Sequence, residues 1–243
     1  LIVQAYINTH DSMNRIWPWL DAAMQYDPNM VIPEFNFYYE ADARHNPGRA
    51  VVWTDAYVDP AGKGWLVSAI APAYRGDFLE AVVGADVTID RIVTGVLDKE
   101  IPWQGFLLLI GKSGTLLALP PQAEKLFALK ELTAHDYVDA IRADTFKPEA
   151  FNIFRRADLA AIGNLLKTQP SGTSRLDGPE PHLVAWKTIP SVGWTLMSLV
   201  SEQAVAGESR ALAYDLAVIG WIMLAGLAGF YLVFFWFLYR RAR

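Results

Sequence analysis

The sequence of 243 residues contains no cysteine, which excludes disulfide bonds and a cysteine nucleophile. Its four histidines are scattered without the spacing of metal ligands. Basic residues are not in excess, since 21 Lys and Arg stand against 26 Asp and Glu for a net charge of −5, so nucleic acid is not a predicted partner. The serine-nucleophile, dinucleotide and Walker motifs are also lacking, and we therefore predict no cofactor, no metal and no catalytic activity for this chain.

One end of the chain is strongly apolar. Leu216 to Tyr239 carry no charge and are followed by Arg240, Arg241 and Arg243, a run long enough to span a bilayer as a helix. Arginines after the span predict a cytoplasmic C-terminus, so the residues before the span are expected to lie outside the cytoplasm. Because the chain starts at Leu1 without methionine or a first anchor, we expect it to be a piece of a longer protein in which a cytoplasmic output domain follows the span.

The rest of the sequence predicts an α+β protein. Apolar residues at helical spacing between residues 8 and 26 predict an N-terminal helix. Residues 50–59, 65–74 and 78–89 predict three strands joined by tight turns, followed by a short helix over 90–101. A hairpin is then predicted over 105–120, a mainly helical stretch over 123–169, a polar loop over 170–181, and a final hairpin from 182 to 201.

The two halves resemble each other in sequence. In each half a strand with a tryptophan, Trp53 or Trp186, leads through a glycine-ending turn into a second strand, "GWLVSAIAP" or "GWTLMSLVS". This similarity indicates two related modules in tandem, each an antiparallel sheet flanked by helices.

The stretch "WTDAYVD" holds the sharpest side-chain pattern. Strand alternation places Trp53, Asp55, Tyr57 and Asp59 on one face, and aromatic rings beside carboxylates are typical of cation recognition. A solvated hairpin face and a metal site on the two aspartates are the alternatives.

Asp86 is a second unusual residue, because it follows the apolar strand "FLEAVVGA". A buried carboxylate is costly unless it is paired, so Asp86 lies either at a solvated strand end or in a pocket that receives a cation. In the same stretch Thr88 and Asp90 share its strand face and allow a calcium site, although Asp90 is also placed to cap the following helix.

Four segments together resemble the extracytoplasmic double Cache sensor domains of bacterial chemoreceptors, sensor histidine kinases and diguanylate cyclases. They are "FNFYYEADARHNPGR", "VVWTDAYVDPAGKGWLVSAIAP", "FLEAVVGADVTID" and "VAWKTIPSVGWTLMSLV". The resemblance implies two PAS-like modules and a homodimer. It implies a receptor of the bacterial inner membrane, with a periplasmic sensor region and a cytoplasmic output domain such as a kinase or cyclase. It implies a membrane-distal module over residues 1–100 with an incomplete N-terminal helix, a membrane-proximal module over 101–205, and a juxtamembrane and transmembrane helix over 206–243.

The resemblance also implies a ligand site in the distal module. Tyr57 and Asp59 match a Tyr-x-Asp motif and Asp86 matches a later aspartate, which bind the amino group of amino-acid ligands in this family. The family's Arg-x-Trp-Tyr motif for the carboxylate is replaced by Asn36-Phe37-Tyr38-Tyr39, so Arg44 or Arg49 would have to substitute for its arginine. We therefore predict a small amine-containing or amino-acid-like ligand, bound by Tyr38, Tyr39, Trp53, Tyr57, Asp59 and Asp86.

Two other function classes compete with the sensor. One is a membrane-anchored envelope hydrolase that uses a metal held by Asp55, Asp59, Asp86 and Asp90. The other is a binding module that recognises a partner protein in place of a small molecule.

Overall fold

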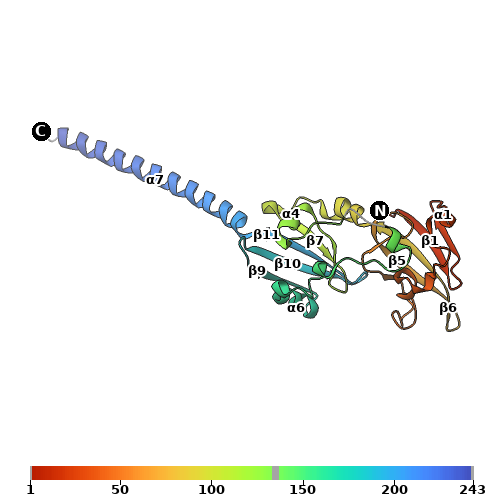
Figure 1. Cartoon of the computed structure of the whole chain (residues 1–243). Coiled ribbons are helices and arrows are strands. Elements are labelled where there is room, and N and C mark those ends of the chain that lie inside the picture. The colour runs from red at the N-terminus through yellow and green to blue at the C-terminus, as the bar shows by residue number, and fades with distance from the viewer. Residues whose placement is uncertain (1, 133–136, 242–243) are drawn as a thin grey trace.

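The computed structural model describes residues 2–132 and 137–241. Two antiparallel sheets follow one another along an elongated body, and a long helix leaves the end of the body that holds the second sheet (Figure 1). The first sheet therefore lies at the end of the molecule away from that helix.

The first sheet is formed by residues 4–88. In chain order this part comprises β1 (Gln4–Thr9), β2 (Asn14–Trp17), α1 (Ala22–Gln25), the 3-10 turn η1 (Ile32–Glu34), α2 (Asn36–Tyr39), β3 (Val52–Trp53), β4 (Tyr57–Val58), β5 (Trp65–Arg75) and β6 (Phe78–Thr88). A short helix with a π-helical continuation then leaves the sheet, as predicted; its parts are α3 (Ile89–Ile92) and η2 (Val93–Leu97).

The second sheet is formed by residues 106–201. This part comprises η3 (Pro102–Gln104), β7 (Phe106–Ile110), β8 (Leu116–Ala118), α4 (Pro121–Phe127), α5 (Tyr137–Ala140), η4 (Glu149–Phe151), η5 (Ala157–Leu159), α6 (Ala160–Thr168), β9 (Ser171–Leu176), β10 (His182–Ile189) and β11 (Trp194–Ser201). The chain ends in α7 (Glu202–Arg241).

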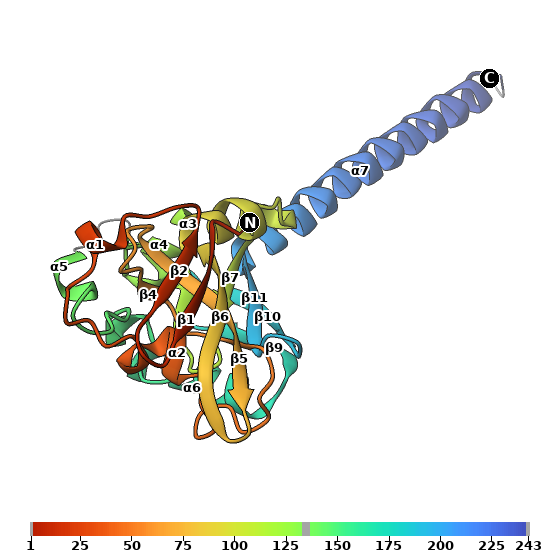
Figure 2. The same cartoon turned by 90° about the vertical axis from the view of Figure 1, so that its right-hand side faces the viewer.

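Both sheets have the same topology. The order of the first is β2-β1-β6-β5-β3, with β4 also paired to β5, and the order of the second is β8-β7-β11-β10-β9 (Figure 2). In each sheet the last strand lies between the first strand and the strand that precedes it along the chain. The weak sequence repeat thus corresponds to a repeat of topology, and the predicted α+β architecture of two antiparallel sheets with helices is confirmed.

Side-chain alternation divides the first sheet into two faces. Along β5, Leu66, Ser68 and Ile70 point to one side and Trp65 and Val67 to the other. The first side packs against aromatic residues of η1 and α2. The second side packs against the second sheet through a shared set of apolar residues, the junction core, which includes Val58, Trp65, Val67, Val87, Leu109 and Leu117.

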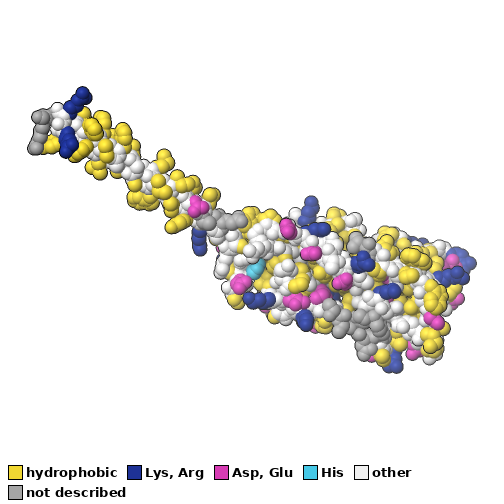
Figure 3. Space-filling view, turned by 90° about the horizontal axis from the view of Figure 1, so that it is seen from above, with side chains coloured by type: hydrophobic (Ala, Val, Ile, Leu, Met, Phe, Trp, Pro, Cys, Tyr) yellow, Lys and Arg dark blue, Asp and Glu magenta, His cyan; other side chains and the backbone are white. Residues whose placement is uncertain are grey.

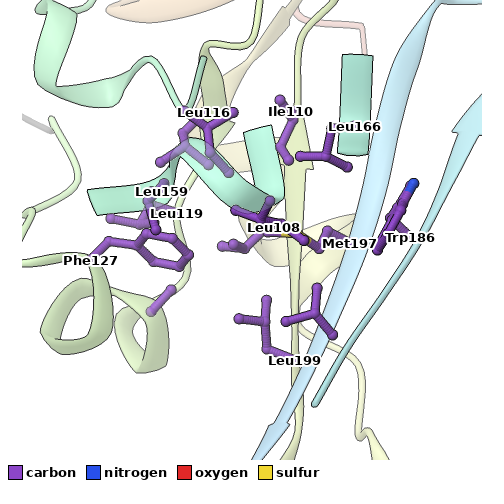
Figure 4. Packing of buried hydrophobic residues seen from close by; sticks show 14 of the residues in the cluster. Leu108, Ile110, Leu116, Leu119, Phe127, Leu159, Leu166, Trp186, Met197 and Leu199 are labelled. Atoms are coloured by element: carbon purple, nitrogen blue, oxygen red, sulfur yellow. The ribbon is translucent and has the colours of Figure 1, made fainter. Parts of the chain in front are cut away.

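The second sheet has its own core on its other face. Leu108 and Ile110 of β7 meet Met197 of β11 and the apolar side of α4 and α6 (Figure 4). Leu108 and Leu199 are fully buried. Both faces of β7 are thereby covered, which explains why its sequence, "FLLLI", is apolar throughout.

The predicted N-terminal helix is wrong. Residues 4–17 form a hairpin instead, and only Ala22–Gln25 are helical. The reason is tertiary: β1 pairs antiparallel with β6 along its whole length, which buries Gln4, Tyr6 and Asn8 on one face.

The prediction of a mainly helical stretch over 123–169 is wrong in part, because α4 ends at Phe127, α6 begins at Ala160, and the described residues between them form only short helical turns and isolated β-bridges. The prediction of a polar loop over 170–181 is also wrong in part, because Ser171–Leu176 form β9 at the edge of the second sheet.

One segment of the second half crosses to the first sheet. The backbone N–H of Val58 in β4 donates to the carbonyl of Thr145 at 3.0 Å, and Tyr57 forms a β-bridge with Phe146. The next residue, Lys147, has a fully buried side chain that donates to the Leu117 carbonyl at 3.1 Å and to Glu131 Oε1 at 2.5 Å. Residues 145–147 therefore bind both sheets, and we call them the crossing segment.

The terminal helix α7 continues directly from β11. It has 40 residues. Its most apolar part has a mean hydropathy of 2.2, and no residue of that part is buried in the protein. Apolar side chains cover it between charged ends (Figure 3). Among the described residues this one helix is long and apolar enough to cross a membrane.

The buried Lys147–Glu131 pair gives a first prediction. Replacing Lys147 by Met leaves a buried carboxylate without its cation and is expected to lower the free energy of unfolding by about 3 kcal/mol. Thermal unfolding of the whole chain in detergent, followed by tryptophan fluorescence, measures the change. Lys125→Met is the matched control, because Lys125 forms an exposed pair with Glu180; equal effects of the two substitutions would contradict the prediction.

Candidate ligand-binding site

Two carboxyl groups from different parts of the first sheet lie close together in its interior. Asp59 follows β4, and Asp86 is the ninth residue of β6, a strand with neighbours on both sides. Their side chains are buried, with 3% and 0% of the residue surface exposed. Sheet register places Gln4 and Ser68 directly opposite Asp86 on the two adjacent strands.

The side chain of Gln4 connects the two carboxyl groups. Its amide nitrogen Nε2 donates to Asp86 Oδ2 at 2.6 Å and to Asp59 Oδ2 at 3.2 Å. A single nitrogen with two N–H groups thus lies between two carboxyl oxygens, at distances typical of hydrogen bonds.

The two carboxyl groups accept further hydrogen bonds from the sheet and from a turn. The hydroxyl of Ser68 donates to Asp86 Oδ1 at 2.6 Å, and Tyr57 is hydrogen-bonded to Ser68 at 2.7 Å. The Asp59 carboxyl accepts the backbone N–H groups of Ala61 at 2.9 Å and Lys63 at 3.0 Å. The Pro60–Gly64 turn therefore fixes Asp59 in the way an Asx turn does.

Tyr6 covers the pair from β1. Its ring lies flat over Gly84, where an added Cβ would be 2.0 Å from the ring carbon Cζ, so only glycine permits this position. The Tyr6 hydroxyl is buried and has no hydrogen-bond partner in the described part of the chain. An unpaired buried hydroxyl is costly, and it marks a place where a polar ligand atom would be stabilised.

A cavity of about 10 Å³ separates these groups, which is room for about one water molecule. It is lined by Gln4, Tyr6, Asn8, Asn14, Ile16, Tyr26, Phe37, Tyr57, Asp59, Pro60 and Asp86. This lining contains two carboxyl groups and neither lysine nor arginine, so its electrostatic preference is for a cation.

Burial dominates the electrostatics of the pair. It raises the pKa of Asp86 to about 8, with a further rise from the charge of Asp59, while the Ser68 and Gln4 hydrogen bonds act in the opposite direction. Burial also raises the pKa of Asp59, against the hydrogen bonds from Ala61, Lys63 and Gln4. At neutral pH the pair therefore retains a proton that an entering cation would expel.

Only three of the six predicted binding residues line this cavity, namely Tyr57, Asp59 and Asp86. The predicted common face of Trp53 to Asp59 is wrong, because β3 and β4 are separate strands of two residues. Trp53 points to the second sheet, with its ring centroid 4.7 Å from that of Trp194.

Tyr38 and Tyr39 also lie outside the cavity. The Tyr38 hydroxyl donates to the Leu79 carbonyl at 2.9 Å within the core of the first sheet. The ring of Tyr39 packs against His45, with 5.2 Å between centroids. Phe37, between them in the sequence, takes the place in the cavity that was predicted for these tyrosines.

The four aspartates of the hydrolase alternative do not form one cluster. Asp55 accepts a hydrogen bond of 2.7 Å from Ser113 and lines a separate cavity of about 290 Å³ at the junction of the two sheets, together with Glu40, Lys112 and Trp194. Asp90 is exposed in α3, and the helix is capped by Thr88 instead of Asp90. Across residues 2–132 and 137–241, no three acidic or histidine side chains converge to hold a metal ion.

Neither arginine proposed for a ligand carboxylate lines the cavity. Arg49 donates to the Gly76 carbonyl and to Asp77 at the β5–β6 turn, and its guanidinium lies over the ring of Tyr74. Arg44 is exposed on the loop after α2. The site thus offers partners for an ammonium group and none of opposite charge for a carboxylate.

Several lining residues were missed by sequence reasoning. Gln4, Tyr6 and Asn8 alternate with Ala5 and Ile7, a strand pattern that the helix prediction for the following residues obscured. Ser68, which donates to Asp86 but does not line the cavity, was also missed, although a single hydroxyl within the apolar run "WLVSAIAP" is a visible signal.

Comparison with known proteins gives related folds at low sequence identity. No family model matches the chain. The ligand-binding domain of the Pseudomonas aeruginosa PAO1 amino acid chemoreceptor PctB, in complex with L-Gln, is 15% identical, with a TM-score of 0.56 over 88% of this chain and 76% of that one. The domain of the Pseudomonas fluorescens chemoreceptor CtaA with L-isoleucine is 17% identical, with a TM-score of 0.53 over 84% and 71% of the two chains. The fold is that of a Cache-type ligand-binding domain.

A curated relative has a detectable sequence similarity. The methyl-accepting chemotaxis protein McpC of Bacillus subtilis (strain 168) is 29% identical over 124 residues, which is 51% of this chain and 18% of McpC. The chain therefore spans less than a fifth of the length of this relative.

The raised pKa of Asp86 predicts how stability depends on pH. A carboxyl group with a pKa near 8 in the folded state and 3.8 in the unfolded state stabilises the fold at low pH, and this stabilisation is lost as the pH rises through about 8. We expect the unfolding temperature of the whole chain in detergent to fall by about 5 °C or more between pH 5 and pH 8.

Asp86→Asn is expected to flatten this decline, because the amide does not titrate. Glu40, whose pKa burial also raises to about 8 outside the cavity, contributes separately, so Glu40→Gln measures its share. A decline of the same steepness in Asp86→Asn and the unsubstituted chain would contradict the assignment.

Proposed function

We propose that this chain is the extracytoplasmic ligand-sensing region of a bacterial transmembrane receptor, and that it binds a small molecule with an ammonium group between Asp59 and Asp86. The observation that supports this most is the cavity lining, in which two buried carboxyl groups and an unpaired hydroxyl meet without a basic side chain. Such a site offers a cation two partners of opposite charge and offers an anion none.

The ligands of the compared structures agree with this chemistry. PctB is in complex with glutamine or arginine, Mlp24 with asparagine and CtaA with isoleucine. These amino acids share an α-ammonium group, which is the part of a ligand that the site of this chain suits. We infer that the ligand here is an amine, or an amino acid whose carboxylate is bound differently.

The arrangement along the chain supports the sensor over an enzyme. We place a membrane-distal module in residues 1–100, a membrane-proximal module in 101–205 and the juxtamembrane and transmembrane helix in 206–243, with the modules periplasmic and the C-terminus cytoplasmic. A homodimer follows from the resemblance to double Cache receptors. The separation of Asp55 and Asp90 from the carboxyl pair disfavours the metal-dependent hydrolase.

Binding of an ammonium group is expected to depend on pH through the proton of the carboxyl pair. Titration calorimetry of the whole chain in detergent with ethanolamine, putrescine and L-alanine is the measurement. Below pH 8 the affinity should weaken about tenfold per pH unit, because one proton leaves for each cation bound. Heats measured in two buffers of different ionisation enthalpy count that proton.

Asp86→Asn is expected to weaken amine binding about thirtyfold, or about 2 kcal/mol, since it removes a charged hydrogen-bond partner. Glu40→Gln is the matched control, a half-buried carboxyl group outside this cavity, and should change the affinity less than about twofold. Unchanged affinity in Asp86→Asn would overturn the site.

We also propose a route by which occupancy reaches the membrane helix. Tyr57 and Val58, next to the site, are bonded to the crossing segment, and its Lys147 is bonded to Leu117 in β8. From β8 the ladder runs through β7 to β11, which continues as α7. A ligand that binds one arrangement of β4 better than another would bias this chain of contacts.

Hydrogen exchange tests the route. Saturating amine should slow exchange at residues 57–58 and 145–147 and change it at the β11–α7 connection. Asp144 is the residue before the crossing segment. Its carboxyl group accepts the backbone N–H of Asn36, the first residue of α2, with both oxygens about 3 Å from that nitrogen. In Asp144→Asn we expect amine affinity to stay within about threefold while the change at β11 is reduced; a full change at β11 would argue for another route.

A further inference from the structure

The cavity between Asp59 and Asp86 is too small for the ligand that its chemistry suits. Its volume of about 10 Å³ accommodates one water molecule and no amine with carbon atoms. A side chain of the lining must therefore move when a ligand binds, and the hydrogen bonds decide which one.

Most groups around the carboxyl pair are fixed by contacts outside it. Asp59 is held by the two N–H groups of its turn, and Asp86 is held through Ser68 to Tyr57. Gln4 differs, because the hydrogen bonds that hold its amide nitrogen are those to the two carboxyl groups. An ammonium group that takes these oxygens removes the contacts that keep Gln4 in place.

We propose that the Gln4 amide is an internal substitute for the ammonium group of the ligand, and that it must be displaced for the ligand to bind. Its nitrogen, 2.6 Å from Asp86 and 3.2 Å from Asp59, occupies the position that a bound ammonium nitrogen takes. Gln4 thereby stabilises the empty state, and a ligand binds only if its interactions with the two carboxyl groups are more favourable than those of the amide. This inference rests on the proposed amine-binding function.

The substitution also defines the class of amine. When Gln4 leaves, Asp59 Oδ2 keeps the hydrogen bond from the Lys63 N–H, whereas Asp86 Oδ2 loses the one that Gln4 donates. A ligand that displaces Gln4 must therefore return an N–H donor to Asp86, or leave a buried acceptor unpaired. A primary ammonium has three N–H groups and a positive charge, so its hydrogen bonds to the carboxyl groups are stronger than those of the neutral amide. A quaternary ammonium has no N–H group, and the site should discriminate against it.

The position of Gln4 can be tested without a ligand. Gln4→Lys places a tethered ammonium between the carboxyl groups; lysine is one bond longer than glutamine, and the adjoining cavity provides that space. Gln4→Met has similar length and no N–H group. Unfolding temperatures of the whole chain in detergent are measured from pH 5 to pH 8. The titratable groups facing Asp86 are Asp59, Tyr6, Tyr26 and Tyr57, and the tyrosines stay protonated in this range.

We expect Gln4→Lys to be more stable than Gln4→Met at pH 8 and to have a weaker decline with pH, because its ammonium stabilises both ionised carboxylates. Gln122→Lys and Gln122→Met are the matched controls at an exposed residue of α4, and their unfolding temperatures should not differ from each other in this way. If Gln4→Lys is destabilised as much as Gln4→Met, with the same pH profile, the inference is overturned.

The ligand arm compares ethanolamine with choline, which differ only in the three methyl groups on nitrogen. Calorimetry at pH 8 should find ethanolamine bound at least about tenfold more tightly by the unsubstituted chain, the equivalent of a lost hydrogen bond to a charged group. Gln4→Met should bind ethanolamine about tenfold more tightly than the unsubstituted chain, because no amide competes, and Gln4→Lys should bind it at least about thirtyfold more weakly.

The two arms separate the inference from the function on which it rests. Ethanolamine binding that is unchanged in Gln4→Met and Gln4→Lys overturns the displacement of Gln4 and leaves an amine sensor. Absence of binding to the unsubstituted chain and to Gln4→Met overturns the amine ligand, while a stabilised Gln4→Lys still supports the ammonium-like position of the amide.

Discussion

The burial of two carboxyl groups beside one another is the constraint on which the first half of the molecule depends. Such a pair is unfavourable in an apolar interior, and the surrounding residues compensate for it in different ways. Gln4 and Ser68 donate hydrogen bonds from the strands on either side of Asp86, a turn donates two backbone N–H groups to Asp59, and burial favours a retained proton. The site is therefore assembled from β1, β4, β5 and β6, and its geometry exists only when all four are in register.

Strand alternation and turn chemistry in the sequence predicted much of the fold. The β5–β6 hairpin, the β7–β8 hairpin, the β10–β11 hairpin and the apolar terminal helix are confirmed where the sequence predicted them. The prediction of a helix before residue 26 is wrong, because the residues of β1 gain their partners from β6, about 80 positions later in the chain. Local spacing does not contain that information, and Met13 and Ile16 fit a helical period as well as they fit an edge strand.

The site was predictable in its acidic half and not in the rest. Asp59 and Asp86 are conspicuous as charges beside apolar strands, and they do lie together. The position of Trp53 depends on a break in the extended chain between β3 and β4. The residues at this break include no glycine or proline, so the packing of Trp53 against Trp194 could not be predicted from the sequence. Gln4 was not predicted because it lies in β1, whose pairing partner β6 is distant in the sequence.

The direct continuation of β11 into α7 has a mechanical consequence. No loop separates the central strand of the second sheet from the 40-residue helix, so a rotation of the strand would be passed directly to the helix. At 1.5 Å per residue the helix is about 60 Å long, and a rotation of about 3° at the sheet would displace its far end by about 3 Å. In the proposed receptor the helix would act as a lever arm, which would turn a repacking too small to alter the fold of either sheet into a displacement on the scale of a helix–helix contact.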